Sequence, residues 1–326
     1  MSAHVVGATP RLGDPAVAAI PAGSAAPTPP APAAPLRAGR GQVVRDYVAL
    51  TKPRVVSLLV VTSVAAMFVA QSGTPALDLL AAVIGGGWLA AGGANAINMW
   101  FDRDIDAEMY RTRQRPIPAG RVPARRALAF GIVLNVLAFV ILTARANLLA
   151  ASLTLSASLF YVFVYTMWLK RSTPQNIVIG GAAGAFPPLI GWAAVTGHLS
   201  LTALYMFMIV FFWTPPHFWA LAIRLSGDYG RAQVPMMPEV RGGGETRRWI
   251  LLYTLVLVAI TLLPGLQGFG LFYLVASLAL GAGFIAMAVL TLLEDGRRWA
   301  RRTFTYSLAY LAAIFAAMVV DALIRG

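Results

Sequence analysis

The chain has 326 residues, of which 58% are hydrophobic and only 12% charged, and its formal net charge is +13. Charged residues usually make up about a quarter of a soluble domain, so the composition excludes an ordinary water-soluble enzyme and indicates an integral membrane protein. The absence of cysteine excludes disulfides, thiolate metal sites and a cysteine nucleophile.

Residues 1–46 form a basic tail, rich in Ala and Pro, before a membrane domain of residues 47–326. Prolines interrupt the short apolar stretches of the tail, so no secretory signal is expected. We predict a disordered cytoplasmic tail. A mitochondrial transit peptide is the alternative, because Asp14 is the only acid in residues 1–40, but the prolines oppose the amphipathic helix that it needs.

Nine apolar runs follow, most of them about as long as a helix that crosses a hydrocarbon core. They lie at about 55–72, 77–100, 127–144, 147–169, 176–196, 201–223, 249–265, 270–293 and 303–323. Very short connections at Arg145 and at 197–200 predict antiparallel neighbours. The glycines at 85–87 and at 180, 181 and 184 predict close helix packing.

The positions of the basic residues predict the orientation of these spans. If the N-terminus is inside, 24 of the 26 Lys and Arg residues fall on the inner side of the membrane. The two exceptions are Arg145 and Arg325. This asymmetry is the usual topology signal of membrane proteins. It predicts a cytoplasmic N-terminus and an outer C-terminus, and it explains the net charge without a nucleic-acid partner.

The loop after the second span carries the densest polar pattern. Asn98, Asp102 and Asp106 are spaced four residues apart, so on a helix they share one face. Such oxygen ligands at a membrane surface suit Mg²⁺, which completes its shell with water and substrate phosphates. Asp104 points away and is expected to pair with an arginine.

Arg111, Arg113 and Arg115 follow these acids directly. Carboxylates that hold a metal beside arginines that bind phosphate predict a diphosphate site. The alternative is a solvated helix end with ordinary ion pairs between residues four apart.

The sixth span continues into the second polar loop. Pro215 and Pro216 are expected to break the helical hydrogen bonding there. His217, an ionisable residue inside a span, is a functional candidate, or a neutral ring bonded to a freed carbonyl. Asp228 would share its face if one helix continued, but Ser226 and Gly227 favour a turn.

At these two loops the chain resembles the intramembrane prenyltransferases of the UbiA superfamily, and among them the branch that modifies heme. The similarity lies in NMWFDRDID (98–106), MYRTRQRPIPAG (109–120), LTKPRV (50–55), QNIVIGGAAGAFPPLIGW (175–192) and WTPPHFWALAI (213–223). Met99 replaces an acid of the superfamily motif, as is typical of the heme branch. In the second loop, Ser226 and Gly227 stand where an acid is common, which leaves Asp228 as its only carboxylate.

The resemblance implies an all-α fold of nine transmembrane helices around a central cavity. It also implies transfer of farnesyl from farnesyl diphosphate to the 2-vinyl group of heme B, giving heme O and diphosphate. The product would feed heme–copper oxidases, so a heme O monooxygenase and oxidase assembly proteins are candidate partners. The implied location is the inner membrane of a bacterium, with both loops on the cytoplasmic side.

The same resemblance assigns roles to individual residues. Metal ligands would be Asn98, Asp102, Asp106 and Asp228, and the catalytic set would be Asp102, Asp106, Arg111 and Arg115. Diphosphate would be bound by Lys52, Arg111, Arg115, Lys170 and Arg171, and heme would be bound or oriented by His217 and Asn95.

Three alternatives remain at this point. A prenyltransferase for another acceptor, such as a quinone precursor, would share the first loop but not the PPHFW segment. A transporter would carry ionisable residues along its spans or show internal repeats. A structural oxidase subunit would leave the clustered acids and arginines unexplained.

Overall fold

The computed structural model describes residues 39–325, and within that range every regular element is helical. Nine helical segments there are long and apolar enough to cross a membrane, as the sequence predicts. They are α2 (Pro53–Gln71), α3 (Leu77–Phe101), α5 (Ala124–Arg145), the Leu148–Ser172 segment, α8 (Asn176–Thr196), α9 (Leu201–Arg224), the Gly242–Gln267 segment, α13 (Leu271–Leu293) and α14 (Arg298–Arg325).

Two of these segments contain more than one kind of helix. The fourth consists of α6 (Leu148–Leu159), the π-helix η1 (Phe160–Leu169) and α7 (Lys170–Ser172). The seventh joins α12 (Gly242–Leu262) to the 3₁₀ turn η2 (Leu263–Gln267). Four short helices lie outside the spans: α1 (Arg40–Leu50), α4 (Arg103–Glu108), α10 (Ser226–Arg231) and α11 (Met237–Val240).

Residues 1–38 lie outside the described range, so the predicted disorder of the tail stays a prediction there. The expectation is wrong for residues 40–46, because α1 begins at Arg40 and continues to Leu50. Asp46 on this helix is buried and accepts a 2.9 Å hydrogen bond from Arg121 Nε. This contact fastens α1 to the loop that follows α4.

Short connections place consecutive helices side by side. Asn147 and Ser200 cap α6 and α9 by accepting hydrogen bonds from the backbone N–H groups of Ala150 and Ala203. Gly197 ends α8 with a φ of 73°, in the left-handed region that glycine adopts without strain. The predicted neighbours α5 and α6, and α8 and α9, are in contact.

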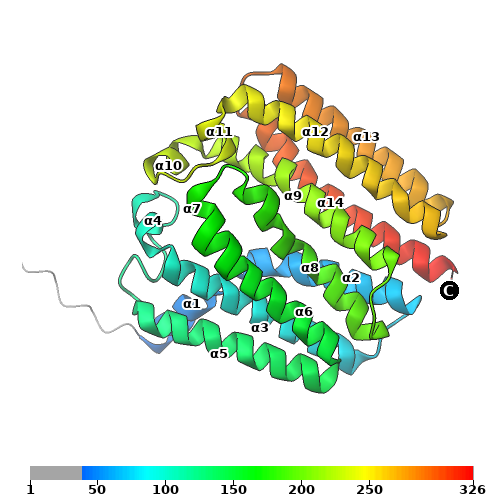
Figure 1. Cartoon of the computed structure of the whole chain (residues 1–326), viewed down its shortest axis with the longest axis horizontal. Helices are drawn as coiled ribbons and strands as arrows, with labels where there is room; N and C mark the ends of the chain where they lie inside the picture. The colour runs from blue at the N-terminus through cyan, green and yellow to red at the C-terminus, as the bar shows by residue number, and fades with distance from the viewer. Residues whose placement is uncertain (1–38, 326) are drawn as a thin grey trace, which may run out of the picture. The chain divides into compact units, whose positions relative to one another are not determined.

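The interior is built around α2, α8, α9 and α14. Helix α8 packs between α2 and α9, α9 also contacts α12 and α14, and α14 returns to α2 (Figure 1). The largest hydrophobic cluster of the described residues spans this group, with Met206 and Phe315, and extends to α12 and α13, where it includes Phe284. Helix α9 continues through Pro215 and Pro216 to Arg224, so the expected break does not end the helix.

Close packing by glycine occurs at some of the predicted positions. A β carbon on Gly86, Gly180 or Gly181 would meet a side chain of another helix at 2.2–2.7 Å. Gly85 and Gly184 have open space at that position, so the prediction is wrong for these two.

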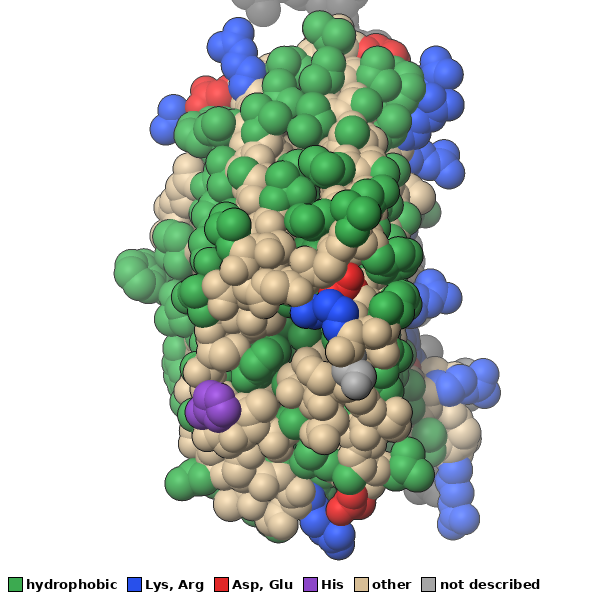
Figure 2. Space-filling model, turned by 90° about the vertical axis from the view of Figure 1, so that its right-hand side faces the viewer, with side chains coloured by type: hydrophobic (Ala, Val, Ile, Leu, Met, Phe, Trp, Pro, Cys, Tyr) green, Lys and Arg blue, Asp and Glu red, His purple; other side chains and the backbone are tan. Residues whose placement is uncertain are grey.

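The short helices α4, α10 and α11 gather at one end of the bundle, and the C-terminus of the described chain lies at the other (Figure 1). Figure 2 views the end that carries the C-terminus, where hydrophobic side chains cover much of the surface and charged ones lie mostly toward the margins. The two polar loops therefore meet at one end of the helices.

Candidate functional site

Asn98, Asp102 and Asp106 form a buried row where α3 passes into α4. The backbone N–H of Asp102 bonds to Asn98 O at 2.9 Å, and that of Asp106 bonds to Asp102 O at 2.8 Å. The helical path therefore carries through Asp102, although α3 ends at Phe101. Asn98 Nδ2 donates to Asp102 Oδ2 at 2.7 Å, and all three side chains are at most 3% exposed.

Four basic residues from three separate segments surround this row. Lys52, before α2, donates to Asn98 Oδ1 at 2.9 Å, and Arg115 Nη1 contacts both oxygens of Asp106 at 2.7 and 2.8 Å. Lys170 is paired with Asp102, and Arg171 Nη2 lies 3.7 Å from the second oxygen of that carboxylate. The fifth predicted cation, Arg111, is exposed, and its backbone N–H donates to Asp228 of the second loop at 3.5 Å.

Lys52 owes its position to an unusual backbone. It has a φ of 50° and precedes Pro53, the first residue of α2. Burial, with Arg115 and Lys170 nearby, lowers the pKa of the Lys52 ammonium to about 7. A phosphate anion in contact with this amine would favour its charged form again.

Asp102 retains an unsatisfied oxygen. Its side chain is fully buried, and Oδ1 has no hydrogen-bond donor among the described residues. Arg171 Nη2, at 3.7 Å, is too far away to donate to this oxygen. A buried carboxylate oxygen without a hydrogen bond is costly, unless a closer cation or donor completes it. An amide and two carboxylates in one row fit Mg²⁺, which needs only one or two carboxylates and takes its other oxygens from water and phosphate.

Asp228 joins the two loops rather than extending the row. It lies on α10 and accepts hydrogen bonds from the backbone N–H groups of Tyr110 at 3.1 Å and Arg111 at 3.5 Å. Burial favours its neutral form, but these bonds and Arg231 hold the pKa of Asp228 below its usual value. Within residues 39–325 no three His, Asp or Glu side chains cluster as a metal site, so its predicted role as a ligand stays a prediction.

Asp104 points away from the row and pairs with an arginine, as expected from its spacing. Its two oxygens bind Arg171 at 2.7 and 2.8 Å, and these bonds lower the pKa of the carboxyl to about 2. Asp104 and Arg171 also line a cavity of about 350 Å³ that reaches Gln233 and Val234 of the second loop. Arg171 is therefore held between Asp102 and Asp104 of the first loop.

His217 and Asn95 occupy other parts of the helical bundle. The His217 ring is stacked between Trp213 and Phe304, with centroid distances of 4.2 and 4.6 Å, and its Nδ1 lies 2.7 Å from Ser307 Oγ on α14. Asn95 accepts a 3.4 Å hydrogen bond from the Tyr161 hydroxyl. Both predicted heme contacts are thus held by neighbouring helices.

Thr166 is a site residue that sequence reasoning missed. Its hydroxyl accepts a 3.2 Å hydrogen bond from Asn98 Nδ2 and donates to Tyr161 O at 2.8 Å. The bond to a carbonyl five residues earlier reflects the π-helical turn, a feature found often at functional sites. The available signal was a set of hydroxyl-bearing residues within an apolar span, Tyr161, Tyr165 and Thr166.

Comparison with known proteins places the chain in a family. Residues 59–314 match the model of the UbiA prenyltransferase family. A protein of Symbiobacterium thermophilum named protoheme IX farnesyltransferase is 56% identical over 86% of this chain and 95% of its own length. One of Roseiflexus sp. strain RS-1 with the same name is 53% identical over 87% of this chain, which spans 53% of that relative.

Solved structures share the fold at much lower identity. The structure of a digeranylgeranylglyceryl phosphate synthase is 18% identical, with a TM-score of 0.73, and covers 87% of this chain and 99% of its own. A UbiA homolog from Archaeoglobus fulgidus bound to DMAPP and Mg²⁺ is 17% identical, with a TM-score of 0.63, and covers 84% and 99%. With nine apolar helices within residues 39–325 and a family match over most of its length, the chain is a multi-pass membrane protein that belongs to the UbiA prenyltransferase family.

Proposed function

We propose that the protein transfers the farnesyl group of farnesyl diphosphate to the 2-vinyl group of heme B, giving heme O and diphosphate. The observation that carries the proposal is the buried row of Asn98, Asp102 and Asp106 with basic side chains around it. Such a site suits a diphosphate leaving group. The name shared by relatives 50–56% identical to this chain supplies the donor and acceptor.

The residues of the site act on the leaving group. Asn98, Asp102 and Asp106 would hold Mg²⁺, which when bound would stabilise negative charge on the diphosphate. Arg115, Lys170 and Arg171 release their carboxylate partners and neutralise the phosphate oxygens, with Lys52 and Arg111 completing the set. The carbon–oxygen bond of the donor breaks and diphosphate leaves. The vinyl carbon forms the new carbon–carbon bond, which leaves a cation beside the porphyrin, and water adds there, supplying the hydroxyl of the product and releasing one proton.

The acceptor is proposed to lie in an apolar cavity between the helices, with His217 and Asn95 binding or orienting the porphyrin. An apolar cavity keeps water from the farnesyl cation until the new bond has formed. Asp228 closes the site by holding the first loop, and it is proposed as an additional metal ligand.

We further propose that the loops face the cytoplasm across a bacterial inner membrane. The chain contains no cysteine, so single-cysteine variants can report the topology directly. In intact spheroplasts, a membrane-impermeant maleimide should label His198→Cys, between α8 and α9. It should label Glu108→Cys, at the end of α4, only when the membrane is opened. Labelling of Glu108→Cys in sealed cells would reverse the orientation.

The reaction is tested with purified protein in liposomes, supplied with heme B, farnesyl diphosphate and Mg²⁺. Mass spectrometry should detect farnesylated, hydrated heme, and EDTA should abolish its formation until Mg²⁺ is restored. A parallel arm replaces heme B with a quinone precursor. Product in that arm alone would show that the acceptor is a quinone precursor rather than heme B. Turnover in EDTA would refute the requirement for a metal ion.

Thr166→Val is expected to lower kcat/KM by roughly tenfold, about the effect of one lost hydrogen bond to a buried polar group. The change removes one of the two acceptors of Asn98 Nδ2, so the amide is oriented only by Asp102 and Lys52. Thr154→Val is the matched control: this buried threonine in the same span bonds only to Ala150 O. Equal losses in the two variants would mean that Thr166 acts through helix stability alone.

A further inference from the structure

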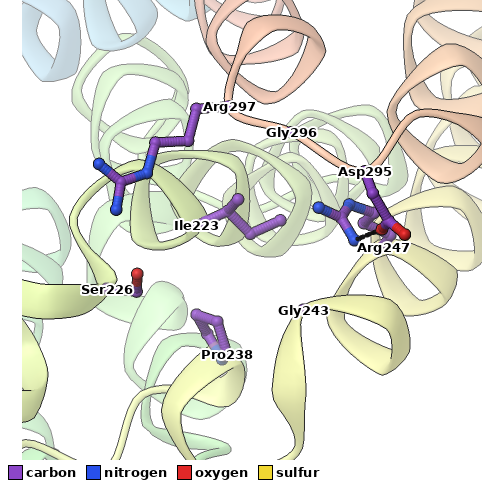
Figure 3. A pocket seen from close by; sticks show the side chains of 8 residues that line it. All are labelled: Ile223, Ser226, Pro238, Gly243, Arg247, Asp295, Gly296 and Arg297. Carbon is purple, nitrogen blue, oxygen red and sulfur yellow. Dashed lines mark hydrogen bonds and ion pairs between the residues drawn. The ribbon is translucent and has the colours of Figure 1, made fainter.

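A second pocket lies at the loop end of the bundle, apart from the row of acids. It has a volume of about 350 Å³ and is lined by Ile223 at the end of α9, Gly243 in the first turn of α12, and residues of the α13–α14 connection (Figure 3). Two arginines line it as well, Arg247 from α12 and Arg297 from the connection. No role in the proposed reaction involves this pocket.

Arg247 is the unusual member of the pocket. The residue is only 8% exposed, and its Nε has no hydrogen-bond partner within the described residues. Its only ion-pair partner there is Asp295, whose oxygen lies 2.5 Å from Nη1 and whose side chain is 96% exposed. A buried guanidinium with an unused donor needs a further acceptor, since leaving such a donor unsatisfied is costly.

The backbone beside Arg247 offers further donors. Helix α12 is 21 residues long and begins with Gly242, Gly243 and Gly244, and no side chain caps its start. The first N–H groups of a helix lack partners within the helix and favour anions. At Gly243 the pocket wall is bare backbone, because glycine has no side chain, and the position of its missing β carbon lies 3.5 Å from Arg247 Nη1.

The charge of the pocket is positive. Among the described residues, Asp295 is the only carboxylate that lines the pocket, beside two arginines. Asp295 pairs with Arg247, and Arg297 forms no ion pair within the same residues. The adjoining first two turns of α14 add Arg298 and Arg302, which lie over the Trp299 ring at 5.8 and 4.5 Å. Trp and Arg at the end of a span are typical of the headgroup level of a membrane.

We propose that this pocket binds the phosphate group of an anionic phospholipid, held by Arg247, Arg297 and the start of α12. Basic pockets between spans at the membrane surface suit such headgroups. Asp295 is paired with Arg247 Nη1 and therefore competes with the lipid phosphate for this guanidinium. The site is independent of prenyl transfer, so it can be tested without the substrates.

The test is native mass spectrometry of the full chain in mild detergent, titrated with phosphatidylglycerol or phosphatidylcholine. Wild type should bind phosphatidylglycerol roughly tenfold more tightly than Arg247→Gln or Arg297→Gln, the expected loss for a charge-assisted hydrogen bond. Arg248→Gln, on the exposed side of α12, should bind as wild type does. Asp295→Asn should bind more tightly, whereas a purely structural Arg247–Asp295 pair predicts no gain.

Arg297 is exposed, so its variant tests the site even if Arg247→Gln fails to fold. Equal binding of phosphatidylglycerol by wild type and Arg297→Gln would overturn the proposal, as would equal affinity of wild type for both lipids. Millimolar inorganic phosphate forms a competing arm. Unchanged lipid binding in its presence supports a lipid site, and full displacement would assign the pocket to a soluble phosphate instead.

Discussion

Asp102→Asn is expected to lower turnover by roughly 10²–10³-fold, the usual cost of removing one electrostatic contact to the transition state. Asp102 is fully buried, and one of its oxygens has no donor among the described residues. Asparagine preserves the shape but carries no charge for a metal, and one of its two positions becomes a donor. Turnover is measured at saturating farnesyl diphosphate, heme B and Mg²⁺, by mass spectrometry of the product.

The control for the substitution itself is Asp78→Asn, at the exposed opposite end of α3, which should retain full activity. A second control separates the loss of the carboxylate from the loss of its ion pair. In Asp102→Asn, Lys170 loses its partner, and an uncompensated buried charge can destabilise a fold by about 3–5 kcal/mol. The double variant with Lys170→Met removes that charge. We expect it to fold more stably and to remain inactive.

Two outcomes would contradict the assignment. Turnover of Asp102→Asn within a few-fold of wild type would remove the carboxylate from the reaction. Recovery of activity in the double variant would show that the loss came from the stranded Lys170 rather than from a missing ligand. A thermal melt followed by fluorescence-detected size exclusion identifies variants that fail to fold.

The sequence predicts the spans well because the membrane sets their length. Predicted and observed bounds agree closely for 77–100 and 176–196, yet α14 starts at Arg298 rather than near 303. The difference arises because hydropathy marks contact with lipid, whereas Arg301 and Arg302 continue the helix into the polar region. Charged residues at a span end are compatible with the helix but invisible to an apolar window.

Some contacts of the site follow from local sequence spacing, whereas others join segments that are far apart in the sequence. The contact of Asn98 with Asp102 follows from a spacing of four residues, which any helix brings together. Lys52 and Lys170 come from other segments, and only family resemblance placed them beside the row. The hydroxyl groups of this span mark Thr166 as polar, but its contact with Asn98 could not be predicted, because a π-helical turn depends on how η1 packs against its neighbours and leaves no periodic signal.

Gly191→Ala is expected to destabilise the protein by about 3 kcal/mol or more, at the upper end for overpacked sites. Helix α8 crosses α2 at this residue, and a β carbon would lie 2.0 Å from the carbonyl oxygen of Ser63. The obstacle is the backbone of another helix, which cannot rotate aside as a side chain can. The melting midpoint, followed by fluorescence-detected size exclusion, and resistance to SDS should both fall.

Gly184→Ala on the same helix is the matched control, since a β carbon there meets nothing within 4 Å. It should leave stability unchanged or raise it by up to about 1 kcal/mol, the helix-propensity gain of alanine over glycine. Similar melting of both variants would show that α2 and α8 can separate freely. The added methyl group should also push α2 away from α8 in the folded protein. Lys52, at the start of α2, would then move with its helix, so Gly191→Ala should raise the KM for farnesyl diphosphate even below its melting temperature.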